Sequence, residues 1–178
     1  MAPGGTSEIA SVMQIDGDIL EARIARGCRC FVARADDEVV AFGWLATRTE
    51  WIGELELEIT PGEREAYIWN CATHPDHRRQ GFFRAIVNGI AAQARREGLS
   101  RLWIGTIDIP PAKAVADVGF VPALRFTTVW HAGIRWLRVR RAEPSDIDLQ
   151  TAARQVMAIR GRPLRIGTSM KRAVQRHH

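Results

Sequence analysis

A strand-like run that leads through a short basic turn into a long amphipathic helix constrains this chain more than any other feature. Residues 66–73 form the strand-like run, Arg78 to Gly81 form the turn, and the helical pattern continues to Glu97. The first turn of a helix carries backbone N–H groups without intrahelical partners, and together with the helix dipole they favour an anion. Gly81 lets an anion approach the backbone closely, and Arg78 and Arg79 can add charge-assisted hydrogen bonds. The sequence therefore predicts an anion site suited to a diphosphate; the alternative is a solvated basic loop that only caps the helix.

The patterns on either side of this unit predict strands and helices in one mixed domain. Residues 8–25 are typical of helical segments interrupted near Gly17, and residues 28–34 and 39–47 are expected to form a hairpin around a polar turn. Residues 102–107 are expected to form a strand parallel to the one before the basic turn, because a helix connects them. The remaining elements are expected as strands over 53–60, 124–131 and 134–139, a short helix over 110–118, and a helix over 146–159 with Ser145 as N-cap.

The strand expected over 53–60 alternates strictly, with Glu54, Glu56 and Glu58 on one face and apolar residues on the other. Such an acidic row would attract a cationic amine if it faced a ligand cleft, and a carboxylate can accept a proton through water. A solvent-facing row on an edge strand would give the same pattern. Asn70, inside the strand before the basic turn, is a further polar candidate.

Length and composition limit the classes of protein that this chain can be. It has 178 residues, 46% of them hydrophobic, which is enough for one domain with a full core, and no apolar run approaches the ~20 residues that span a bilayer. The first residues lack the features of a signal peptide. Cys28, Cys30 and Cys71 form no even disulfide framework, and His74 and His77 lack further ligands, so no metal site is expected and a cytoplasmic setting is predicted.

Positive charge is concentrated at the C-terminal end. Residues 135–178 contain 11 lysines and arginines against three acidic residues, whereas residues 1–134 contain 14 against 17. We therefore expect two parts, a domain over 1–134 and a last strand with a basic extension over 135–178. Trp136 is the only aromatic residue of the extension, so stacking on nucleic-acid bases is not supported and nucleic acid is not an expected partner.

Two segments carry a resemblance to a known family. Ala72-Thr-His-Pro75 followed by Arg78-Arg-Gln-Gly81-Phe-Phe83 resembles the coenzyme A signature of the GNAT superfamily of acyl-CoA-dependent N-acyltransferases, and Ala112 to Phe120 resembles its later helix that ends in Gly-Phe. The resemblance covers roughly residues 8–133. It implies an α/β fold with a mixed, mostly antiparallel central sheet flanked by helices, and acetyl-CoA as cosubstrate without a metal.

The resemblance also implies roles for particular residues. The strand before the turn would pair with the pantetheine arm through its backbone, and the turn would hold the pyrophosphate. The residues so implied are Cys71, Ala72 and Thr73 for the pantetheine arm, and Arg78, Arg79, Gln80, Gly81, Phe82, Phe83 and Arg84 for the pyrophosphate. Two positions depart from the family pattern: Phe83 stands where the signature has a small residue, and Val115 stands where many members have a tyrosine that protonates the leaving thiolate.

These observations together predict an enzyme. We expect transfer of an acetyl group from acetyl-CoA directly to a primary amine of a small molecule or peptide, with Glu56, Glu58 and Asn70 as catalytic candidates. A non-catalytic acyl-CoA-binding sensor is one alternative, and a small basic nucleic-acid-binding protein that depends on residues 135–178 is another. No membrane partner is expected, and a homodimer stays open.

Overall fold

The structure is a computed structural model that describes residues 9–10, 16–53, 56–106, 109–132, 134–143, 146–157 and 164–166. Its elements in chain order are α2 (Gly17–Ala25), β1 (Arg29–Ala35), β2 (Glu38–Ala46), β3 (Glu50–Ile52), β4 (Leu57–Ile59), β5 (Glu65–Thr73), the 3₁₀ turn η1 (Pro75–His77), α3 (Phe82–Arg96), β6 (Arg101–Ile104), α4 (Ile109–Asp117), β7 (Leu124–His131), β8 (Ile134–Arg141), α5 (Ile147–Val156) and β9 (Leu164–Ile166). No helix in this described part is long and apolar enough to cross a membrane.

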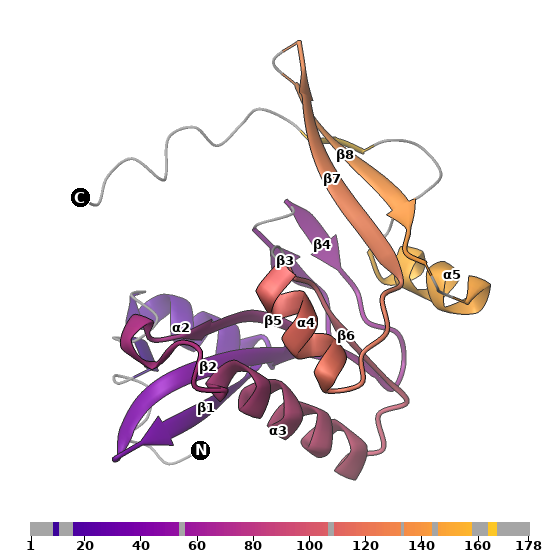
Figure 1. Cartoon of the computed structure of the whole chain (residues 1–178). Coiled ribbons are helices and arrows are strands. Elements are labelled where there is room, and N and C mark those ends of the chain that lie inside the picture. The colour runs from indigo at the N-terminus through magenta and orange to yellow at the C-terminus, as the bar shows by residue number, and fades with distance from the viewer. Residues whose placement is uncertain are drawn as a thin grey trace.

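A four-stranded sheet in the order β1-β2-β5-β6 forms the centre of the molecule (Figure 1). β1 pairs with β2 and β2 with β5 in antiparallel fashion, whereas β5 and β6 run parallel on either side of the α3 crossover. Asp36 and Asp37 form the β1–β2 turn with positive φ angles of 47° and 69°, a conformation that aspartate tolerates better than most residues. The predicted mixed, mostly antiparallel sheet flanked by helices is therefore confirmed.

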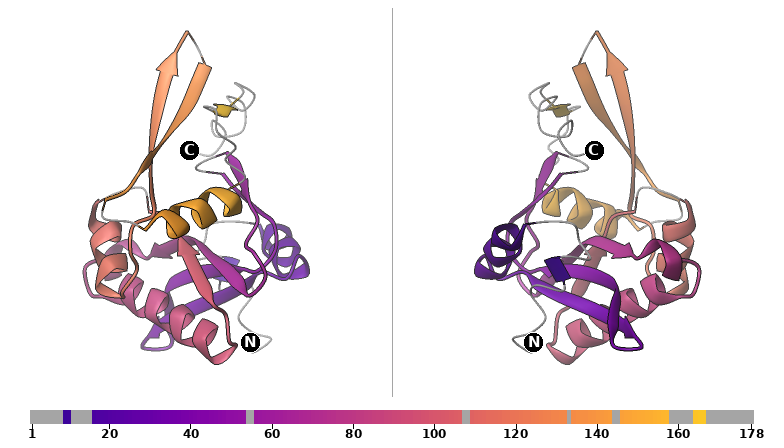
Figure 2. Two further views of the ribbon diagram at one scale, coloured as in Figure 1. Left: turned by 90° about the vertical axis from the view of Figure 1, so that its right-hand side faces the viewer. Right: turned by 90° about the vertical axis from the view of Figure 1, so that its left-hand side faces the viewer.

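Helices cover both faces of this sheet (Figures 1 and 2). On one face, Ala41, Leu45 and Ile68 of the sheet pack against the apolar stripe of α3, and residues that follow α4 join them. On the other face, Trp44 packs with side chains from α2, the β3–β4 hairpin, β8 and α5. Covering on both faces explains why every residue of β2 after Glu38 is buried.

The amphipathic pattern of α3 produces the predicted helix. Its buried side chains are Ile86, Val87, Ile90, Ala91 and Ala94. At the C-terminal end, Gly98 has a φ of +70°, its N–H bonds to the Arg95 carbonyl, and the Leu99 N–H bonds to the Ala94 carbonyl. This is the Schellman arrangement, in which a glycine in the left-handed region ends the helix.

The strand predicted over 53–60 is wrong in its first half. Leu57–Ile59 alone form β4, which pairs with Glu50–Ile52, and the chain turns between them. Glu56 has a φ of 51°, a left-handed conformation that does not continue a strand. The acidic row is therefore interrupted: Glu56 lies in a turn, Glu58 lies in β4, and Glu54 lies outside the described residues.

The C-terminal elements also differ in detail from the prediction. Asp146, not Ser145, caps α5, because its carboxylate accepts a 2.6 Å hydrogen bond from the Asp148 N–H. The predicted pair of strands over 124–139 is present as β7 and β8, but it pairs with β9 in a separate sheet. Figure 2 shows the β7–β8 hairpin extending away from the central sheet, although Leu137 of β8 belongs to the same core as Trp44 of the sheet. The tail over 167–178 lies outside the described residues.

A bulge in β5 shapes the site. Phe42 of β2 lies opposite Ala72, and Trp44 lies opposite Trp69, so β5 contains one more residue than β2 between these pairs. The extra residue is accommodated at Asn70, whose φ is 46°. Among the described residues, the ladder between β5 and β6 ends at the pair Ile68–Ile104. The two parallel strands therefore separate just where the bulge begins.

Candidate active site

The free edge of β5 is the first part of the site. Beyond Ile68, the backbone of Cys71, Ala72 and Thr73 has no strand beside it on the β6 side in the described part of the chain. Unpaired N–H and C=O groups on such an edge can bind an extended ligand in the manner of an added strand. The hydroxyl oxygen of Thr73 is buried without a hydrogen-bond partner among the described residues. This segment, predicted to bind the pantetheine arm, therefore has the free polar groups that such an arm requires.

The basic turn directly follows this edge. The His74 N–H bonds to the Val40 carbonyl at 2.8 Å, which anchors the end of β5 before the 3₁₀ turn. Arg79 and Gly81 both have positive φ, 64° and 89°, and α3 begins at the next residue. The first hydrogen bond of α3 runs from the Ala85 N–H to the Gly81 carbonyl, so the N–H groups before Ala85 point out of the helix end.

The side chains of the turn leave this helix end accessible. Arg78 and Arg79 are exposed, and Arg78 Nε lies 3.4 Å from the Thr73 carbonyl, which holds its side chain beside the free edge of β5. A Cβ added at Gly81 would meet nothing nearer than Arg84 Nη2 at 4.0 Å. The Gln80 side chain donates to the Asp76 carbonyl and is thereby turned back onto the loop. The turn predicted to hold a diphosphate therefore has an open backbone and two available guanidinium groups.

Two phenylalanines occupy the first turn of α3. Phe83 packs against the core on the α3 face of the sheet, so its bulk points away from the helix end. Phe82 is half-buried and stacks edge-on against His77, with ring centroids 5.9 Å apart. The departure of Phe83 from the family signature is thus accommodated by packing, because only its backbone N–H is needed at an anion site.

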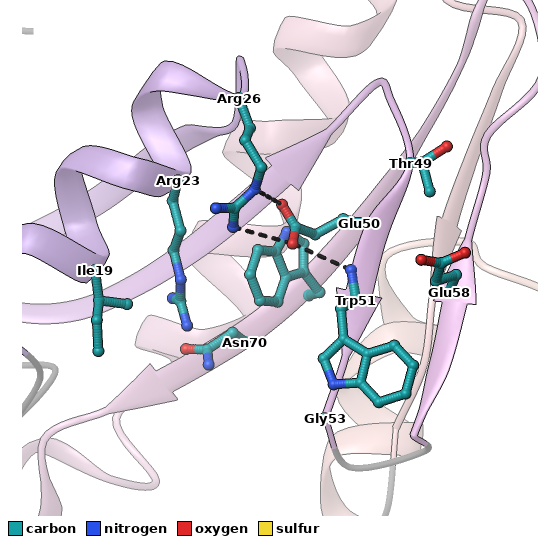
Figure 3. A pocket seen from close by; sticks show the side chains of 10 residues that line it. Ile19, Arg23, Arg26, Thr49, Glu50, Trp51, Gly53, Glu58 and Asn70 are labelled. Carbon is teal, nitrogen blue, oxygen red and sulfur yellow. Dashed lines mark hydrogen bonds and ion pairs between the residues drawn. The ribbon is translucent and has the colours of Figure 1, made fainter.

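A cavity of about 860 Å³ opens on the opposite face of the sheet, beside the bulge (Figure 3). Three segments far apart in the sequence build it: α2, the β3–β4 hairpin and the middle of β5. Its lining residues are Ile19, Arg23, Arg26, Thr49, Glu50, Trp51, Gly53, Glu58, Trp69 and Asn70. Because Trp69 and Asn70 immediately precede the free edge of β5, the cavity adjoins the segment predicted to bind the pantetheine arm.

Only some of the catalytic candidates predicted from the sequence line this cavity. Asn70 and Glu58 line it, and the Glu58 side chain is exposed with no partner among the described residues. Glu56 does not line it. Trp51 pairs with Glu58 across the hairpin and is 48% exposed, so it forms part of the cavity wall and not of the core. Val115, at the position where many family members have a tyrosine, is buried, and its apolar side chain cannot donate a proton.

Glu50 lines the cavity, and no sequence pattern predicted this position. It is only 6% exposed, and its carboxylate accepts hydrogen bonds from Arg26 Nε and Nη2, from the Cys28 thiol and from the Trp51 N–H, each at 3.1 Å. Burial raises the pKa of Glu50, but the hydrogen bonds from Arg26, Cys28 and Trp51 outweigh burial and hold this pKa below its ordinary value. Glu50 thus stays ionised and fixes α2 against β3.

The three thiols are not equipped for nucleophilic catalysis. Burial raises the pKa of Cys28, Cys30 and Cys71 to about 12 in each case. A thiolate is the reactive form, so these thiols are protonated at neutral pH. The thiol of Cys71, which lies beside the bulge, is therefore protonated, which disfavours a role as acyl carrier. Among the described residues, no group of His, Cys, Asp and Glu could hold a metal ion.

We expect the native protein to react with an aromatic disulfide reagent at pH 8 roughly a thousandfold more slowly than the denatured protein, because a pKa near 12 removes most of the thiolate. The absorbance of the released thiol measures the rate, and denaturation should expose all three cysteines. Fast modification of even one cysteine in the folded protein would contradict the burial described above.

Comparison with known proteins agrees with this geometry. A family model described as "Acetyltransferase (GNAT) family" matches residues 8–120, which is more than half of the chain. The chain belongs to the GNAT acetyltransferase family. No curated protein matches it. The matched segment contains the bulged strand, the basic turn and α4.

Solved structures of GNAT proteins share the fold. The ribosomal-protein-S18-alanine N-acetyltransferase of Escherichia coli has 17% identity and a TM-score of 0.52, over 70% of this chain and 77% of that one. An aminoglycoside N-acetyltransferase in complex with coenzyme A has 15% identity and a TM-score of 0.53, over 68% and 88%. An aminoglycoside 6′-N-acetyltransferase of Acinetobacter haemolyticus has 13% identity and a TM-score of 0.51, over 68% and 88%. At these identities the likeness concerns the fold, and the acceptor has to be argued from the cavity.

Proposed function

We propose that this GNAT protein transfers an acetyl group from acetyl-CoA directly to the primary amine of a small molecule or peptide bound in the cavity of Figure 3. One observation carries the proposal: the cavity reaches β5 at Trp69 and Asn70, immediately before the free edge at Cys71 to Thr73. An acceptor in the cavity and a thioester held along that edge would meet at the bulge. Positioning of this kind supplies much of the acceleration of a bimolecular transfer.

The residues that would hold acetyl-CoA are those of the free β5 edge and of the basic turn, from Arg78 to the first turn of α3. When bound, acetyl-CoA supplies an activated acetyl thioester. The cationic acceptor first loses one proton to become a neutral amine. The amine nitrogen then forms a bond to the carbonyl carbon, the carbon–sulfur bond breaks, the nitrogen loses its second proton, and the thiolate gains one. Glu58, exposed on the cavity wall, would attract the cationic acceptor and receive the proton through water. Asn70 would lie nearest the reacting atoms.

A non-catalytic acyl-CoA sensor is the second candidate, because buried Val115 offers no proton to a leaving thiolate. The two candidates share cofactor binding and differ in turnover. Coenzyme A or acetyl-CoA at about 100 times its Kd is expected to stabilise the fold by about 2.7 kcal/mol, measured by thermal or denaturant unfolding. If neither coenzyme A nor acetyl-CoA stabilises the fold, both candidate functions are contradicted. Stabilisation without release of free thiol across a broad amine panel would favour the sensor.

A further inference from the structure

Arg23 of α2 and Arg26, the C-cap residue of this helix, both line the acceptor cavity, but they differ in their surroundings. Arg26 is paired with the buried carboxylate of Glu50. Arg23, one turn earlier, has neither a hydrogen-bond acceptor nor an ion-pair partner among the described residues. Its guanidinium carbon lies 4.5 Å from the ring centroid of Trp69 and 5.3 Å from that of Trp44. Its Nη1 atom is buried without an acceptor, and so is the indole nitrogen Nε1 of Trp69.

The guanidinium of Arg23 is only partly buried, but its Nη1 atom is buried without an acceptor, and the nearby anion Glu50 is already paired with Arg26. An arginine in a protein keeps its proton, so it cannot relieve burial by becoming neutral. Burial lowers the pKa of Arg23, and the charge of Glu50 only partly offsets this effect. The indole faces of Trp44 and Trp69 stabilise the cation, but they accept no hydrogen bond at Nη1. Unsatisfied buried donors of this kind call for a partner, and at a cavity wall that partner can come from a ligand.

The opposite wall of the same cavity carries the complementary charge. Figure 3 shows Arg23 extending from α2 towards Asn70, with Glu58 on the far side beyond Trp51. Glu58 is exposed and unpaired among the described residues, whereas the remaining pair, Arg26 and Glu50, neutralises itself. The cavity therefore presents one available cation and one available anion, separated by an aromatic side chain.

We propose that the acceptor of this enzyme is an amine that also carries a carboxylate, such as a free amino acid, with its carboxylate on Arg23 and its ammonium group drawn to Glu58. The inference rests on the proposed function and adds the substrate class. A guanidinium binds a carboxylate through two parallel hydrogen bonds, which fixes orientation as well as charge. The same Arg23 repels acceptors that carry several positive charges and no anion.

Matched acceptors test this inference. Several amino acids and their carboxamides are compared by thiol release from acetyl-CoA in the wild-type protein and in the Arg23→Met variant, which keeps an apolar side chain over the indoles. The two acceptors of a pair differ in amine pKa, but that difference cancels when the ratio of their kcat/KM values is compared between proteins. We expect the ratio of kcat/KM for the amino acid to kcat/KM for its carboxamide to be about 10- to 100-fold lower in Arg23→Met than in the wild type. Arg95→Met, an exposed arginine in the last turn of α3, should leave the ratio unchanged.

The outcomes separate this inference from the proposed function. If no amine of a broad panel that includes these pairs leads to thiol release from acetyl-CoA, the proposed function itself is contradicted. If other amines are acetylated but no amino acid or carboxamide is, only the carboxylate inference is overturned. If amines are acetylated and Arg23→Met lowers kcat/KM equally for acids and amides, Arg23 has only a structural role and the carboxylate site is overturned. If the Arg23→Met variant does not fold, an inhibition assay of the wild-type protein still tests the inference. Carboxylic acids that lack the amine should inhibit competitively at least tenfold better than their amides, and equal inhibition would overturn the inference.

Discussion

Replacing Arg78 and Arg79 together by alanine is expected to weaken coenzyme A binding about 10- to 100-fold. Both side chains are exposed beside the N-terminal end of α3, where a diphosphate would also meet the free N–H groups of the first helical turn. Each charge-assisted hydrogen bond to a phosphate is stronger than a neutral one, but solvent exposure reduces its contribution. Isothermal titration of coenzyme A against both proteins measures the change in Kd.

The matched control removes two arginines from the other end of the same helix. Arg95 and Arg96 are exposed in the last turn of α3, so the Arg95→Ala, Arg96→Ala variant has the same net charge as the test variant. Its affinity for coenzyme A should stay close to that of the wild type. The difference in Kd between the two variants should become smaller at 1 M salt, because the Debye length is then about 3 Å and exposed charges at larger distances are screened. Equal affinities of the two variants at low salt would show that the diphosphate does not bind at the basic turn.

The local structure of the segment expected to bind acetyl-CoA could be predicted from the sequence because its determinants are local. The strand, the basic turn and the helix are consecutive in the chain, and Gly81 and Gly98 mark the two ends of α3 through backbone conformations that favour glycine. The burial of residues on the α3 stripe follows from the same periodicity. Phe83 lies on the same stripe, and it packs against the core as that position indicates.

The cavity proposed to bind the acceptor could be predicted only in part, because it assembles from segments far apart in the chain. Glu50 and Arg26 meet across 24 residues, and nothing in either local pattern indicates the pair. The alternation over 53–60 led to a wrong strand because periodicity alone does not reveal that Glu56 is in the left-handed region. Asparagine is enriched in that region, so the bulge at Asn70 had a weak local signal that the strand pattern around it concealed.

The packing between the sheet and α3 leads to the second large prediction. Gly43 lies in β2 directly under α3, and a Cβ added there would lie 2.8 Å from Cys71 Sγ and 2.8 Å from Ile86 Cγ2. Both contacts are closer than packed side chains allow, and the region is fully buried. Gly43→Ala is therefore expected to lower the free energy of unfolding by about 1–3 kcal/mol, measured by urea denaturation.

The same glycine-to-alanine substitution at Gly89 is expected to stabilise the protein instead of destabilising it. Gly89 is exposed in the middle of α3, and a Cβ there meets nothing within 4 Å, so alanine should stabilise the protein by about 0.5–1 kcal/mol through helix propensity.

A double-mutant cycle tests the contact at Gly43 directly. Because Cys71 Sγ is one of the two clashing atoms, Gly43→Ala should lower the free energy of unfolding less in a Cys71→Ala background than in the wild type. This coupling reports contact between neighbours. Strictly additive effects of the two substitutions would show that a Cβ at position 43 does not come as close as 2.8 Å to Cys71 Sγ.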